Sequence, residues 1–129
     1  MATVHERQRE LRRQQLSAGR RAFARGEFFD AHELWEAAWN ASDGAERRWI
    51  QGMIQIATAL HKLAAGRADL ARSLLSKALA KLADAPPSLE GLALLRFAVD
   101  AAALLAALER GDSPAPSTLQ LHDAPPLPR

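Results

Sequence analysis

A pattern of small residues occurs twice in this chain, and the two copies lie forty positions apart. Gly26 is followed by alanines five and twelve residues later, and Gly66 is followed by alanines at the same two offsets. Small side chains where two helices cross let the helix axes approach closely, and a glycine between the helices permits a tight reversal. The repeat therefore predicts two related antiparallel helical hairpins.

Apolar residues recur at helical spacing along most of the chain, and no segment has the alternation of a strand. We expect helices over about 6–25, 28–41, 68–83 and 89–110, and one more that Asp43 caps and that ends near residue 65. The spacing partly matches the second half of a tetratricopeptide repeat. The predicted fold is all-α, a five-helix array of two antiparallel tetratricopeptide-like hairpins closed by the C-terminal helix.

The same pattern divides the chain into a domain and a tail. Residues 1–111 are expected to form a single helical domain. Residues 112–129 contain five prolines and no long apolar run, so we expect an extended or disordered tail, with Leu119 and Leu121 as the side chains able to pin it.

Composition restricts the class of protein. The chain has 129 residues, 48% of them hydrophobic, which is enough for one globular domain, and it has no cysteine for a disulfide or a thiolate metal site. No uncharged apolar run reaches the roughly 18 residues of a membrane span. The first residues lack the apolar core of a secretion signal, so a cytoplasmic protein without membrane contact is expected.

Charge is distributed unevenly. Residues 1–25 hold seven arginines against two glutamates, or +5, and the net charge of +2 leaves −3 for the remainder. Nucleic acid or an acidic partner is the functional interpretation of such a helix. No aromatic residue is interleaved with these arginines, so a solvated helix face is the better interpretation and nucleic acid is not expected as a partner.

The first copy of the repeat alone contains the run from His32 to Trp39. His32 and Glu36 lie one helical turn apart, as do two tryptophans of the run, so an imidazole and a carboxylate are expected to project beside two indoles. If this helix packs on the next one, His61 and a row of glutamines would join them. The candidate polar cluster comprises His32, Glu33, Trp35, Glu36, Trp39, Gln51, Gln55 and His61.

These residues resemble a known family, the domain of unknown function 309, whose members are small prokaryotic all-helical proteins. The resemblance rests on the runs from Phe28 to Trp39 and from Trp49 to His61, followed by Gly66 and residues 71–79. It is strongest over residues 23–82. It implies a helical array without an established activity, and a pattern centred on His32, Glu36, Trp39, Gln51 and Gln55 without assigned roles.

Two functional hypotheses from different classes fit the candidate cluster. The first is a protein or peptide interaction module, because stacked helical hairpins present grooves and no complete catalytic constellation is visible; the cluster would then be a hydrogen-bonded network between two helices. The second is a metal-binding protein or metal-dependent hydrolase, in which His32, Glu36 and His61 bind a divalent metal with Glu33 or Gln55 in support.

Two questions stay open at this stage. Acid-base chemistry by His32 and Glu36 without a metal is a further alternative, so the pattern does not decide whether the chain is an enzyme. The last helix either closes a monomer or pairs with its counterpart in a homodimer.

Overall fold

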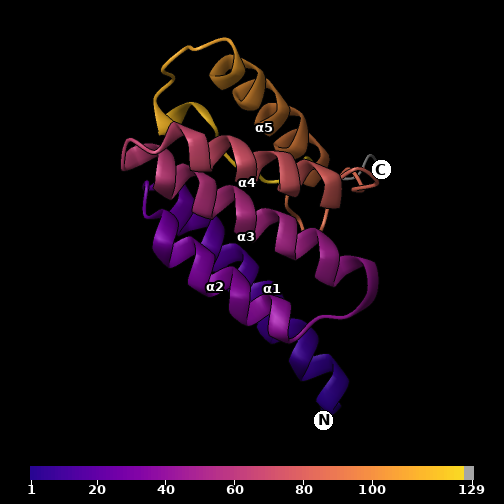
Figure 1. Cartoon of the computed structure of the whole chain (residues 1–129). Helices are drawn as coiled ribbons and strands as arrows, with labels where there is room; N and C mark the ends of the chain where they lie inside the picture. Colours follow the sequence, from indigo (N-terminus) through magenta and orange to yellow (C-terminus); the bar gives the residue numbers. More distant parts are fainter. Residues whose placement is uncertain (127–129) are drawn as a thin grey trace.

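The computed structural model describes residues 1–126 and consists of helices joined by short turns (Figure 1). The α-helices are α1 (Val4–Ala24), α2 (Phe28–Asn40), α3 (Gly44–Ala64), α4 (Ala68–Lys81) and α5 (Leu94–Glu109), followed by a 3₁₀ turn, η1 (Pro116–Thr118). Each α-helix packs against the next in the chain. Over the described residues no strand is formed beyond two isolated bridges, so the predicted all-α fold is confirmed.

The two repeat glycines end α1 and α3 in the same way. Gly26 and Gly66 have φ values of 78° and 80°, in the left-handed region that glycine adopts without strain. The next residue in each turn donates its N–H back across the last turn, from Glu27 to the Ala22 carbonyl at 2.9 Å and from Arg67 to the Lys62 carbonyl at 2.8 Å. This is the Schellman arrangement, and it produces the two tight reversals that the repeat predicts.

Side-chain size at the helix crossings differs between the copies in a compensating way. Gly19 of α1 faces Trp35 of α2, and a Cβ atom on Gly19 would lie within 2.8 Å of the indole Cε2. The residues forty positions later are Ala59 and Leu75, both fully buried. The larger indole therefore requires the smaller neighbour, whereas leucine in the second copy leaves room for a methyl group.

An aromatic cluster joins the first copy to the last helix. Phe23 of α1 stacks on Trp35 at a centroid distance of 5.7 Å, and Phe97 of α5 meets Phe23 edge to face at 5.4 Å. The Trp35 indole N–H donates to the Leu16 carbonyl at 3.1 Å, which satisfies its only donor inside the core. The closing helix thus contributes to the core at the first hairpin as well as packing on α4.

The last helix begins later than the sequence predicts. The two prolines at 86 and 87 and the cap residue Ser88 favour a start at 89, but α5 begins at Leu94. Glu90 and Gly91 instead adopt φ values of 48° and 82°, and Leu89 and Leu92 exchange backbone hydrogen bonds across this turn at 2.9 Å. Consecutive positive φ values are incompatible with a right-handed helix.

The tail packs on the helices rather than standing apart. Leu119 and Leu121 are 1% and 3% exposed, and η1 lies against α3. The Ala93 N–H donates to the His122 carbonyl at 2.8 Å, and the Ala124 N–H donates to the Gly91 carbonyl at 2.7 Å. Two alternating leucines and these backbone bonds hold an extended segment against the start of α5. Within residues 1–126, no helix has the length and apolar character needed to span a bilayer.

Candidate functional site

The histidine and glutamate one turn apart on α2 meet as their spacing predicts. His32 Nε2 lies 3.5 Å from Glu36 Oε2, with the imidazole 28% and the carboxylate 53% exposed. The other ring nitrogen, Nδ1, is enclosed and has no hydrogen-bond partner among the described residues. The pair therefore lies at the surface of α2, with one edge of the imidazole covered by protein.

Phe29 links this pair to the next helix. Its side chain is 55% exposed, and its ring centroid is 5.8 Å from the His32 ring and 6.0 Å from the His61 ring on α3. Phe28, Phe29, His32, Thr58 and His61 line a small hollow of about 70 Å³ with an almost wholly apolar lining. The sequence predicted that the two histidines lie near each other, but the phenylalanine between them was not identified.

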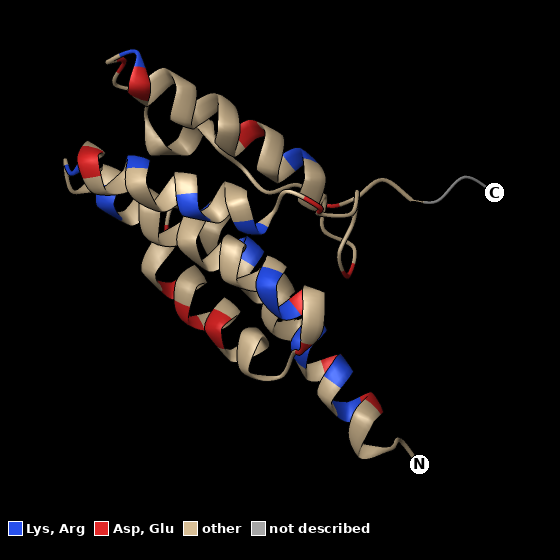
Figure 2. Cartoon of the chain, turned by 45° about the vertical axis from the view of Figure 1, so that its right-hand side comes forward, with Lys and Arg blue, Asp and Glu red and all other residues tan. Residues whose placement is uncertain are grey.

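The rest of α2's outward surface is acidic. At 100° per residue, Glu33 and Glu36 follow Phe29 along the solvent side of the helix, one and two turns later, with Asp30 at one edge. All four side chains are exposed, and α2 contains no lysine or arginine. In Figure 2 the acidic residues of α2 follow one another along the helix. We call Phe29, His32, Glu33, Glu36 and His61 the α2 surface.

The two glutamines of the candidate cluster lie elsewhere. Gln55 accepts a hydrogen bond from Lys81 Nζ of α4 at 3.0 Å, and Gln51 is exposed. The reason is the side of α3 that they occupy: Gly52, between them, contacts Leu82 after α4, whereas Thr58 and His61 lie beside Phe29 of α2. Among the described residues no hydrogen bond joins either glutamine to His32 or Glu36.

The three tryptophans have three different environments. Trp35 is fully buried in the core. Trp39 is half-buried, with the Arg47 guanidinium carbon 3.7 Å from its ring centroid. Trp49, also half-buried, donates its indole N–H to Asp84 Oδ1 at 3.0 Å. This bond, followed by the charge of Arg48, lowers the pKa of the Asp84 carboxyl below its ordinary value.

The structure does not support one shared metal site. Within residues 1–126, no three histidine, aspartate or glutamate side chains are grouped closely enough to hold a single ion. His32 and Glu36 approach each other, but His61 lies against the aromatic ring of Phe29. The three-ligand arrangement of His32, Glu36 and His61 considered from the sequence is therefore not formed.

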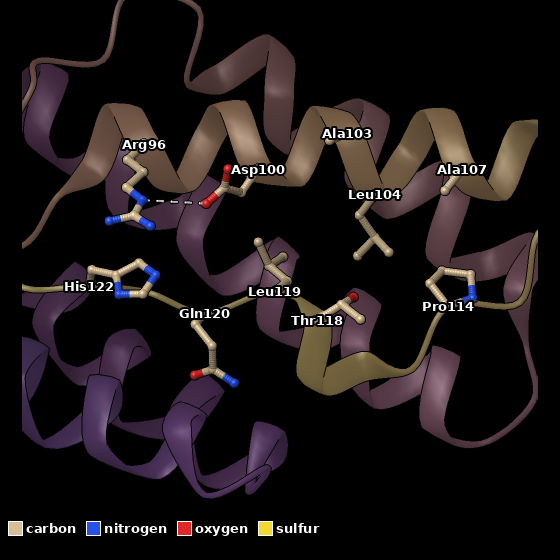
Figure 3. A pocket seen from close by; sticks show the side chains of 10 residues that line it. All are labelled: Arg96, Asp100, Ala103, Leu104, Ala107, Pro114, Thr118, Leu119, Gln120 and His122. Carbon is tan, nitrogen blue, oxygen red and sulfur yellow. Dashed lines mark ion pairs between the residues drawn. The ribbon is translucent and has the colours of Figure 1, made fainter.

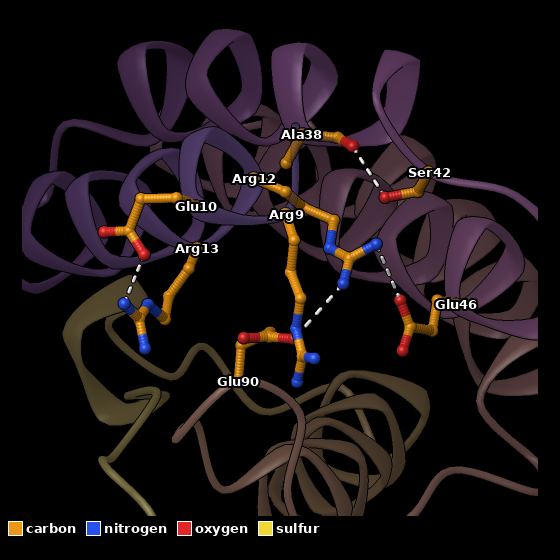
Figure 4. A network of polar contacts seen from close by, with 8 residues as sticks. All are labelled: Arg9, Glu10, Arg12, Arg13, Ala38, Ser42, Glu46 and Glu90. Atoms are coloured by element: carbon orange, nitrogen blue, oxygen red, sulfur yellow. Dashed lines mark hydrogen bonds and ion pairs between the residues drawn. The ribbon is translucent and has the colours of Figure 1, made fainter. Parts of the chain in front are cut away.

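Sequence reasoning missed a polar cluster that joins α1, α3 and the α4–α5 turn (Figure 4). Arg12 of α1 bridges Glu46 of α3 at 3.0 Å and Glu90 of the α4–α5 turn at 3.2 Å. The Arg12 and Glu90 side chains are only 14% and 10% exposed. The one signal for this cluster in the sequence is the arginine-rich first helix, but spacing along one helix does not identify distant carboxylates.

A hollow beside the tail lies between α5 and residues 114–122 (Figure 3). It has a volume of about 400 Å³, and none of the candidate cluster lines it. Its most prominent charged group, Arg96, lies 3.8 Å from Asp100 one turn along α5.

Comparison with known families identifies the region that carries the candidate cluster. The family described as Domain of unknown function (DUF309) matches residues 16–74. The match covers 59 of the 129 residues of the chain. The DUF309 region runs from the middle of α1 into α4 and includes every residue of the α2 surface, which confirms the suspected family. A search for similar curated proteins gave no match.

Proposed function

We propose that the chain is a protein-interaction module whose α2 surface binds a segment of a partner protein. The observation that carries this proposal is the position of Phe29, a large apolar ring that projects outward between two imidazoles. Aromatic side chains contribute a large share of binding energy at protein interfaces because they bury much area with little loss of conformational freedom.

The charge around Phe29 specifies the chemistry of the partner. Glu33 and Glu36 lie one and two turns beyond the ring, and Asp30 is beside it. A partner segment with an apolar side chain near lysines or arginines would place that side chain against Phe29 and its cations against these carboxylates. The partner is therefore expected to be a basic amphipathic segment. It would be recognised mainly by one apolar contact with Phe29 and by ion pairs with the carboxylates of α2.

Random peptides selected for binding to the immobilised full chain test the proposal. Enriched peptides are expected to share an apolar anchor with lysine or arginine within about one helical turn of it. Fluorescence anisotropy with an enriched peptide then compares wild type with Phe29→Ala, which is expected to weaken binding at least about tenfold. Leu11→Ala is the matched control, because Leu11 is also about half exposed but lies on α1.

Charge reversal on α2 tests whether its carboxylates contact the cations of the partner. The double variant Glu33→Lys, Glu36→Lys is expected to bind this peptide more weakly than wild type does. Added salt is expected to weaken peptide binding to wild type more than peptide binding to the double variant. Failure to enrich any peptide, or an enriched peptide that binds Phe29→Ala as tightly as wild type, would contradict the proposal.

A further inference from the structure

The side of α5 that faces away from the core is mainly apolar over about three turns. Leu94, Phe97, Ala101, Leu104 and Leu108 face inward and are buried. The opposite side is mainly apolar and consists of Leu95, Val99, Ala102, Ala103 and Ala106, which we call the outer face of α5, with Arg96 at its edge. Figure 2 shows how few charged residues this helix has.

Two large side chains of this face are strongly exposed. Leu95 is 43% and Val99 is 59% exposed, and a hollow of about 480 Å³ with a mostly apolar lining lies next to them, bounded also by Pro87 and Pro125. The alanines further along the face are short enough to let another helix axis approach closely. A helix that is apolar on both sides has a partner on both sides in a stable assembly.

The charges beside the outer face identify the partner as a second copy of the chain. Arg96 and Asp100 lie on one flank of the face, four residues apart, and pair within the helix at 3.8 Å (Figure 3). When two identical helices pack antiparallel about a two-fold axis, residues equally far from the centre meet on the same flank. A centre near Ala98 places Arg96 of each copy beside Asp100 of the other.

We propose that the outer face of α5 binds the same face of a second copy in an antiparallel, two-fold dimer. The apolar side chains supply the contact, and the two cross-helix ion pairs favour the antiparallel direction, since a parallel two-fold pairing places the flank with Arg96 and Asp100 against the opposite flank of the partner helix. This surface shares no residue with the α2 surface. The dimer leaves that surface open and does not depend on the function proposed for it.

Sedimentation equilibrium of the full chain over a range of concentrations tests the dimer. Wild type is expected to shift from the 14.1 kDa monomer to twice that mass as concentration rises. Val99→Glu is expected to raise the dissociation constant at least about tenfold, because it buries a carboxylate in the contact. Leu11→Glu, at an exposed leucine of α1, is the control and is expected to leave the dissociation constant unchanged.

A pair of charge variants separates this dimer from other contacts. Arg96→Asp and Asp100→Arg each place like charges together and are expected to be monomeric alone, whereas an equimolar mixture is expected to form mixed dimers. The chain has no cysteine, so Val99→Cys is also expected to form a disulfide-linked dimer on oxidation, and exposed Ala37→Cys on α2 is not. A wild-type monomer at every concentration, or a mixture that stays monomeric, overturns the proposal.

Discussion

Gly19 and Trp35 show how one residue's size is set by another on a facing helix. The Trp35 indole occupies the space that a Cβ on position 19 would need. Its N–H donates to the carbonyl of Leu16, which lies on α1 with Gly19. Forty positions later the pair is alanine and leucine. The duplicated fold therefore accommodates two residue pairs at this crossing, glycine with tryptophan and alanine with leucine. In each pair the size of one residue is matched to the size of the other.

Gly19→Ala is expected to destabilise the chain by about 1–3 kcal/mol, because overpacking outweighs the helix propensity of alanine, worth about 1 kcal/mol. In a Trp35→Leu background, which recreates the pair of the second copy, the same substitution is expected to cost nothing or to stabilise. Urea unfolding of the four proteins measures this coupling. Equal costs of Gly19→Ala in both backgrounds would show that the indole does not set the size of residue 19.

Asp84 gives the stability a component that depends on pH. Its carboxyl has a lowered pKa in the folded chain, chiefly through the Trp49 indole, so the interaction stabilises above the unfolded pKa and is lost as pH falls through the folded pKa. The difference in melting temperature between wild type and Asp84→Asn is therefore expected to shrink between about pH 6 and about pH 2. Trp49→Phe should reduce the same component. A difference that stays constant with pH would contradict this account.

At the candidate site, spacing along one helix was informative and spacing between helices was not. The separation of His32 and Glu36 predicts their meeting, because residues four apart share a face. Gln55 was expected near them but bonds Lys81 instead, since the period of α3 does not say which neighbouring helix each of its sides faces. Phe29 was missed because spacing along α2 does not show that its ring lies beside His61 of α3.

Among the elements, the ends of α1 and α3 were predictable because residues next to them in the sequence determine them. The start of α5 was not, because it depends on residues far along the chain. Gly26 and Gly66 end α1 and α3 through their own turns. The start of α5 depends instead on the turn at Glu90 and Gly91, which pairs through Leu92 with Asp123 of the tail. No pattern within residues 89–110 contains that partner.

The tail is accordingly expected to behave as part of the core. Leu119→Ala is expected to lower the free energy of unfolding by about 2–4 kcal/mol, because it removes a fully enclosed side chain. Leu11→Ala, at an exposed leucine, is expected to change it by less than about 0.5 kcal/mol. Guanidinium unfolding compares the two variants. Equal, small changes in both would mean that the tail leaves the helices in solution.

In the whole molecule, Arg12 joins three parts of the chain that the repeat does not relate. Residues 1–11 are all exposed, and the first part of α1 projects beyond the other helices (Figure 1); Arg12 is the first side chain of α1 to be partly covered. It holds α1 to α3 through Glu46 and to the α4–α5 turn through Glu90. The ion pairs thus hold both ends of the array together.

The two carboxylates bound by Arg12 are expected to differ in importance. Glu90→Gln is expected to destabilise by about 1–3 kcal/mol, because it leaves an enclosed guanidinium partly unpaired. Glu46→Gln, at a side chain 39% exposed, is expected to cost less than about 1 kcal/mol. Thermal unfolding of both variants gives the comparison. A larger cost for Glu46→Gln would place the important contact on α3 instead.

The proposed function depends on the α2 surface being the part of the molecule that binds the partner segment. Backbone amide resonances of the ¹⁵N-labelled full chain, followed while an enriched basic peptide is added, test it most directly. The account predicts that the largest shifts fall on residues 28–37 of α2 and around His61 of α3, and that they vanish in Phe29→Ala. Shifts concentrated on α5 or on the tail, with α2 unchanged, would contradict it.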